Sequence, residues 1–141
     1  EYFTEGIDNT VLQIGIGKDN ENTFDLPENH QDYGKNVAAY YFFLFPNMMF
    51  NFYPWGLSVN VVKPKSPEET QIEYFTYVWK EELMEKGAGS GLDKVELEDE
   101  EIVESVQKGI KSKAYDRGRY SPRREIGVYY FHKLIQKYYW F

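Results

Sequence analysis

The sequence contains no cysteine among its 141 residues. Without thiols the chain cannot form a disulfide, a thiolate zinc site or a cysteine-held iron–sulfur cluster. It also lacks a run of about eighteen apolar residues, the length that a membrane-spanning helix needs. The longest such stretch, residues 37–45, is short and is followed by a polar turn. We therefore expect no membrane partner.

Basic residues are outnumbered, because 16 Lys and Arg stand against 23 Asp and Glu and give a formal net charge of −7. This balance disfavours a nucleic-acid partner, since binding to phosphate backbones depends on cations that release counterions. The first ten residues lack the basic start and apolar middle of a signal peptide, and no initial methionine is present. We expect a cytoplasmic location and interpret the sequence as a piece of a longer chain.

Aromatic residues are abundant, with 13 Tyr, 10 Phe and 3 Trp. Each ring can bury roughly 150–250 Å² of surface. Two interpretations are open: the rings fill a large core, or they line a cavity with adaptable walls.

Alternating apolar residues, together with an aromatic run of β-forming residues at 38–45, predict β-strands over about residues 11–79. Leu57, Val59 and Val61, for example, alternate with polar residues as a half-buried strand does. The two prolines of residues 63–69 lack backbone donors, so this stretch is predicted to connect two strands. Residues 24–36 are polar and without period, which predicts a long surface connection.

The second half of the chain is predicted to be helical. A glycine-rich hinge at 87–91 precedes helices over about 94–112 and 122–140. Asp93 and Glu96 have the spacing of a capping box, and Ser121 is the expected cap of the last helix. Its expected buried face is Val128, Phe131, Ile135 and Tyr138. Consecutive strands followed by helices predict one α+β domain over residues 1–141.

Asp99 interrupts an apolar stripe on the first long helix. The stripe has the spacing of one helical face and consists of Val95, Asp99, Ile102, Val103, Val106 and Ile110. Because burial of an unpaired carboxylate costs several kcal/mol, an inward-facing Asp99 needs a partner. Three explanations are open: an ion pair with an arginine such as Arg119, access to water near the helix start, or a metal ion.

Four arginines, at positions 117, 119, 123 and 124, form a basic cluster in this acidic chain. Three interpretations are open for this cluster: internal salt bridges, a contact between subunits, or docking of a reductase or ferredoxin.

Several ordered motifs resemble the C-terminal catalytic domain of Rieske non-haem iron oxygenases. The resemblance is to the ring-hydroxylating dioxygenase alpha subunits, especially the branch with choline and glycine-betaine monooxygenases. It covers most of the chain from about residue 12. The motifs are residues 45–57 (FPNMMFNFYPWGL), the Gly-Ala-Gly of 87–89, Leu92-Asp93, Glu98-Asp99, Val103-Glu104, Val106-Gln107, Gly109, Tyr115, residues 118–122 (GRYSP) and Phe131-His132.

The resemblance implies a mononuclear Fe(II) held by two histidines and one aspartate. Asp99 matches the family's aspartate, so the helical stripe and the resemblance select the same residue. The family's His-x4-His pair is missing here, as is its N-terminal domain with a [2Fe–2S] Rieske cluster. We expect His30 to be an exposed loop residue and His132 to be a hydrogen-bonded structural one.

The resemblance further implies a helix-grip fold, like that of START and Bet v 1 proteins, and an O2-dependent mono- or dioxygenase as the parent. Expected partners are an aromatic or quaternary-ammonium substrate, O2, a ferredoxin or reductase electron donor and further copies in a trimer. We expect the isolated piece to be inactive. The alternative hypothesis is a non-enzymatic helix-grip module that binds an apolar small molecule.

Overall fold

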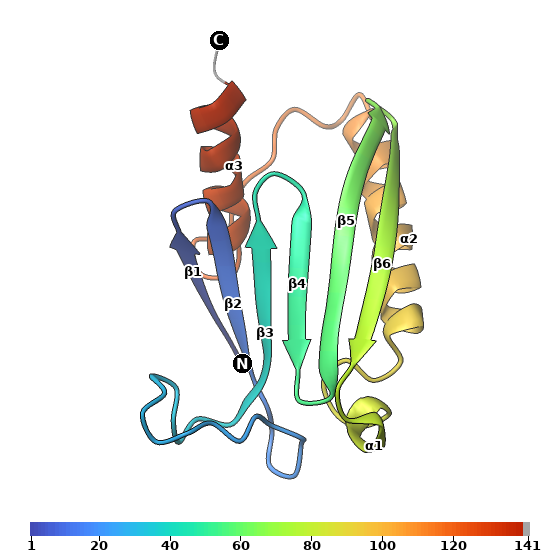
Figure 1. Cartoon of the computed structure of the whole chain (residues 1–141). Coiled ribbons are helices and arrows are strands. Elements are labelled where there is room, and N and C mark those ends of the chain that lie inside the picture. The colour runs from blue at the N-terminus through green and yellow to red at the C-terminus, as the bar shows by residue number, and fades with distance from the viewer. Residues whose placement is uncertain (140–141) are drawn as a thin grey trace.

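The computed structural model describes residues 1–139, and of residues 92–96 it describes the backbone alone. Six antiparallel strands form one sheet in chain order (Figure 1). The strands are β1 (Tyr2–Ile7), β2 (Thr10–Ile16), β3 (Val37–Leu44), β4 (Met48–Tyr53), β5 (Gly56–Ser66) and β6 (Glu69–Val78). The predicted strand region is confirmed, and β1 extends it to the start of the chain. The fold is α+β.

Three helices follow the sheet, namely α1 (Glu81–Met84), α2 (Leu92–Ile110) and α3 (Ile126–Tyr139). Both long helices were predicted, and α3 begins four residues later than expected. Ser121 caps the turn before α3: its Oγ accepts the Arg124 N–H at 3.3 Å, and its own N–H donates to Glu125 Oε2 at 2.5 Å. α2 begins after Gly91, and the predicted capping box lies among side chains outside the described residues.

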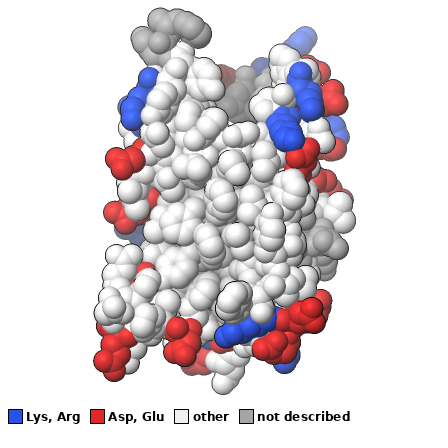
Figure 2. Space-filling model, viewed as in Figure 1, with Lys and Arg blue, Asp and Glu red and all other residues white. Residues whose placement is uncertain are grey.

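The helices lie behind the sheet in Figure 1 and leave its other side uncovered. We call these sides the helical face and the open face. The strand register assigns Gly6, Val11 and Phe43 to the helical face, where α3 contacts them. Figure 2 views the open face and shows charged side chains mainly at its margins. Its middle consists of apolar residues that include Leu12, Phe42, Phe50, Val59 and Phe75.

Helix α3 is fixed to the helical face by aromatic and aliphatic contacts. Leu134 is only 3% exposed, and the Phe131 ring meets the Phe43 ring edge-on with centroids 5.1 Å apart. The predicted buried face of this helix is partly wrong, since Val128 and Tyr138 are exposed. The side of α3 that contacts the sheet is centred on Leu134 and not on the predicted face. Phe131 and Ile135 lie at the borders of this contact and are partly buried.

The best-packed part of the core lies at the lower end of the sheet. Trp55 is 1% exposed, its ring stacks on Tyr53 at 5.1 Å, and its Nε1–H donates to the Ala88 carbonyl at 3.2 Å. A Cβ on Gly89, whose φ is +77°, would lie 2.9 Å from both rings. The glycine-rich segment predicted as a hinge is therefore needed for close approach to these rings.

The connection between β2 and β3 is anchored by a buried carboxylate. Asp32 is 3% exposed, and it accepts hydrogen bonds from Lys35 Nζ at 2.7 Å and from the Tyr40 hydroxyl at 3.0 Å. The hydrogen bond from Lys35 lowers the pKa of Asp32, although burial opposes the shift. His30 accepts the Asp32 N–H through Nδ1. It is partly buried, so the prediction of an exposed loop residue is wrong.

Within residues 1–139, no helix is long and apolar enough to cross a membrane.

Candidate functional site

Helix α2 contacts the edge of the sheet through polar side chains. The Tyr74 hydroxyl on β6 donates to Glu100 Oε1 at 3.3 Å. Near the other end of the helix, Lys111 Nζ donates to Glu68 Oε1 at 2.6 Å, and this hydrogen bond lowers the pKa of Glu68. Both contacts are exposed. Among the described side chains, a polar flank, and not the apolar stripe, therefore holds α2 beside the edge of the sheet.

The apolar stripe of α2 is exposed over all of its described side chains. Ile102 and Val103 are 60% and 68% exposed, and Val106 and Ile110 are also open. The prediction that this stripe is buried is therefore wrong for the chain as described. The helical period is present, but no described residue packs against that side of the helix.

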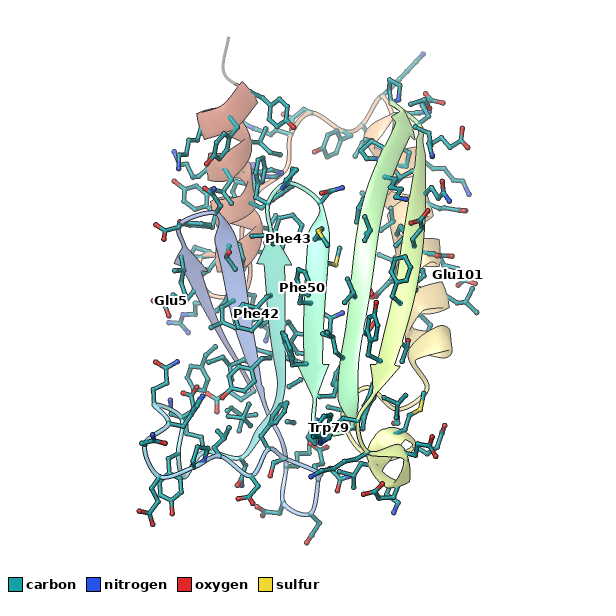
Figure 3. The ribbon with its side chains drawn as sticks, viewed as in Figure 1. Glu5, Phe42, Phe43, Phe50, Trp79 and Glu101 are labelled. Atoms are coloured by element: carbon teal, nitrogen blue, oxygen red, sulfur yellow. The ribbon has the colours of Figure 1, made fainter. Side chains whose placement is uncertain are left out.

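Asp99 is also exposed, so its predicted burial is wrong for this chain. The orientation of α2 explains the exposure. Figure 3 shows Glu101 pointing away from the sheet at the outer margin of the molecule. With about 100° of rotation per residue, Asp99 and Val103 lie on nearly the opposite side of the helix. Asp99 therefore faces the space between α2 and α3 on the helical face, which described residues leave open.

An apolar cavity lies on the same face, between α3 and the middle of the sheet. It has a volume of about 400 Å³. Its walls carry no charged side chain: they are Val11, Phe43, Pro46, Met49, Val62, Gly127, Val128 and Phe131. We use the term hollow for this cavity and for the part of the helical face beside it, between α3 and α2, that no described helix covers. The hollow thus has a sheet floor and one helix on each side.

Three polar residues, Ser58, Asn60 and Asn51, lie on the helical face of β4 and β5 beside the hollow. Ser58 is 1% exposed, and its hydroxyl donates to Asn60 Oδ1 at 3.1 Å. The register places Ser58 opposite Asn51, so both face the helical side. The alternation predicted a half-buried strand without showing that its polar side is the covered one. The available signal for a covered polar side was the presence of one serine and two asparagines on the same side of two neighbouring strands.

A second pocket of about 450 Å³ lies at the lower end of the sheet. Its aromatic wall includes Phe24, Phe52, Tyr77 and Trp79, with Asp25 and Lys80 at its border. The sequence left open whether aromatic rings line a cavity, and these four rings do.

The metal donors among the described residues do not come together. No group of three His, Cys, Asp or Glu side chains in the described residues could hold a metal ion. His132 lies on α3 and hydrogen-bonds the Tyr120 hydroxyl, which confirms its prediction as a structural histidine. No ion pair joins Asp99 to Arg119 among the described contacts. These residues alone therefore do not fit a facial-triad iron site, and Asp99 could supply at most one of its ligands.

Comparison with known proteins identifies the family of this chain. Residues 17–140 match the family model described as ring hydroxylating alpha subunit (catalytic domain). The chain belongs to this family. It is therefore a piece of the catalytic domain of a Rieske oxygenase alpha subunit, as the motifs predicted.

Curated relatives support the same assignment. Choline monooxygenase of Arabidopsis thaliana is 37% identical over 69% of this chain, and that of Spinacia oleracea is 30% identical over 96%. The carnitine monooxygenase oxygenase subunit of Escherichia coli strain K12 is 33% identical over 90% of this chain. The chain spans 24%, 30% and 36% of the lengths of these three relatives.

Proposed function

We propose that this chain forms the C-terminal part of the catalytic domain of an O2-dependent oxygenase, in which Asp99 is the carboxylate ligand of a mononuclear Fe(II). One observation carries the proposal: a carboxylate stands within an apolar helical stripe that faces a hollow. In the longer protein, segments outside this sequence would cover the stripe and contribute two histidines. The [2Fe–2S] Rieske cluster would also lie outside this sequence.

The described residues would supply the environment of that centre. The stripe of α2 and the apolar wall at α3 would exclude water from the hollow once it is closed. Exclusion of water strengthens electrostatic interactions at a charged centre. Ser58 and Asn60 would offer hydrogen-bonding groups at the floor. The sheet with helices on one face is consistent with the helix-grip fold, which we retain as part of the proposal.

For the substrate we propose a quaternary-ammonium compound. The names of the relatives carry this step, since choline and carnitine both contain a trimethylammonium group. The methyl groups of such a cation suit apolar walls, and aromatic faces attract its charge. Phe43 and Phe131 provide rings beside the hollow.

The test is oxygen uptake by the full-length protein that contains this chain. Choline, carnitine and benzoate are supplied separately with a reductant, and the products are identified by mass spectrometry. We expect oxygen uptake coupled to product with choline or carnitine. Coupled product from benzoate alone would replace the proposed substrate class with an aromatic one, and uptake without product would reject both.

The isolated 141-residue chain provides a second test. We expect it to be inactive and to bind Fe(II) only weakly in a calorimetric titration, because one carboxylate does not make a facial triad. Tight binding of one Fe(II) per chain would contradict this.

A second candidate function follows from the uncharged walls of the cavity. A non-enzymatic module would use such a cavity to bind an apolar molecule without metal. A full-length protein that binds an apolar fluorescent probe in the hollow and contains no iron after expression with iron supplied would favour this candidate.

A further inference from the structure

The segment that joins α2 to α3 is strongly basic. We call residues 111–124 the basic linker. It contains six cations, Lys111, Lys113, Arg117, Arg119, Arg123 and Arg124, and a single carboxylate, Asp116. Its formal charge is therefore +5, whereas the whole chain carries −7. The remaining residues together carry a formal charge of −12, so the positive charge is concentrated in one segment of an otherwise acidic chain.

Most cations of the basic linker form no ion pair with the described residues. All six are exposed. Lys111 pairs with Glu68, and Arg117 lies 3.8 Å from its neighbour Asp116. No ion pair with a described residue involves Lys113, Arg119, Arg123 or Arg124. The interpretation of the arginine cluster as internal salt bridges is therefore wrong for Arg119, Arg123 and Arg124 within the described part of the chain.

The basic linker runs along the border of the hollow on the helical side of the molecule. It leaves α2 at the upper end of the sheet and crosses to the start of α3 (Figure 1). Between the two helices it contains turns and irregular backbone only. The cations are thus presented on a surface segment at the border of the candidate site. Three other lysines, Lys18, Lys80 and Lys86, belong to the loops at the lower end.

We propose that the basic linker is the docking surface for an acidic electron-transfer protein. The inference rests on the proposed function, since an oxygenase must receive electrons from a donor. An acidic donor is repelled by a surface that carries −12 and is attracted by the segment that carries +5. Complementary charge steers such encounters and fixes their orientation. At physiological salt this attraction acts within about 8 Å, so docking would occur directly at the linker.

The experiment measures binding of an oxidised plant-type [2Fe–2S] ferredoxin of acidic sequence to the full-length protein that contains this chain. The test variant combines Arg119→Gln, Arg123→Gln and Arg124→Gln. The control variant combines Lys18→Gln, Lys80→Gln and Lys86→Gln, which removes the same charge at the lower end. We expect Kd to rise about tenfold in the test variant and less than about twofold in the control. Raising NaCl from about 20 to 200 mM should weaken wild-type binding.

Several outcomes would overturn the proposal. Binding that is absent, or is weakened equally in both variants, would exclude a specific linker surface. A single-stranded DNA oligonucleotide that binds as tightly as ferredoxin would indicate a nucleic-acid surface. A linker-dependent dimer without ferredoxin would assign the linker to a second copy. If the triple variant loses its circular dichroism spectrum, Lys113→Gln combined with Arg117→Gln replaces it.

The result is separable from the proposed function. Binding is measured with oxidised donor and without turnover, so loss of iron or activity does not affect it. A protein that fails the oxygen-uptake test can still bind ferredoxin at the linker, and an active oxygenase can fail to do so.

Discussion

Helices α2 and α3 are both amphipathic, yet the sheet covers only one of them. α3 buries Leu134 and places Phe131 against Phe43. In contrast, α2 contacts β6 through Glu100, its C-cap Lys111 contacts the β5–β6 turn, and the described side chains of its apolar stripe are open. The period of a sequence determines which side of a helix is apolar. Whether that side is buried depends on which other segments are present. The predictions below test this contrast, beginning with the largest expected effect.

Removing a buried side chain from α3 should cost far more than removing an exposed one from α2. We expect Leu134→Ala to lower the free energy of unfolding by about 3 kcal/mol, because it leaves a cavity against the sheet. The matched change Val103→Ala should stay within about 0.5 kcal/mol, since that side chain is largely exposed. Urea denaturation of the 141-residue chain measures both. Equal losses would show that α2 is packed in solution.

The contact of α3 with β1 depends on the absence of a side chain at Gly6. A Cβ there would lie 2.3 Å from the Tyr130 ring, so the ring must move. We expect Gly6→Ala to destabilise the fold by about 2 kcal/mol through overpacking. Urea denaturation gives the cost, and hydrogen exchange should show faster exchange in α3. Unchanged stability and exchange would mean that α3 is held elsewhere.

The two long connections of the chain also differ in burial. The β2–β3 connection is held by the buried side chain of Asp32, whereas the charged side chains of the basic linker are exposed. We expect Asp32→Asn to cost about 1.5 kcal/mol at pH 7, since two hydrogen bonds to a charged group weaken. The pKa of Asp32 is lowered from 3.8. Its contribution is therefore present above about pH 5 and is lost as the pH falls through the folded-state pKa.

The measurement is urea denaturation of the wild type and of Asp32→Asn between about pH 7 and pH 2.5. The two stabilities should converge at the acid end. A constant difference across the range would show that the carboxylate charge does not stabilise the connection.

The smallest effect is expected on α2 itself. Apart from its chain neighbours and the backbone of its own helix, Gly109 has no described atom within 4 Å of the position of an added Cβ. We expect Gly109→Ala to stabilise the helix by about 0.5 kcal/mol, because alanine loses less backbone entropy than glycine. Circular dichroism with urea denaturation checks the sign. A destabilised variant would indicate that this side of α2 is in contact with another surface.

Much of the fold follows from local patterns. Alternation predicted the strands from residue 11 onward, and both long helices were predicted by their apolar periods. Strand β1 was missed because its side chains Phe3, Glu5 and Ile7 give only a weak pattern. The burial of Asp32 was also missed, because its partner Tyr40 lies on β3 and no spacing rule relates the two.

The candidate site could be predicted only in part, because some of its features depend on contacts between segments that are distant in the sequence. Asp99 stands out as the one charge in an apolar stripe, and that signal is local. The polar floor at Ser58 depends on which side of the sheet the helices cover, which alternation alone leaves undecided. The proposed remaining iron ligands could not be found, because the described residues contain no group of three side chains that could hold a metal ion.

The central claim concerns Asp99, and iron content tests it most directly. In the full-length protein, Asp99→Ala and the neighbouring control Glu98→Ala are analysed for iron per chain, together with the visible absorption of the proposed Rieske cluster. The account predicts that Asp99→Ala loses the mononuclear iron and keeps the cluster absorption, while Glu98→Ala keeps both. An Asp99→Ala protein with the iron content of the wild type would contradict it.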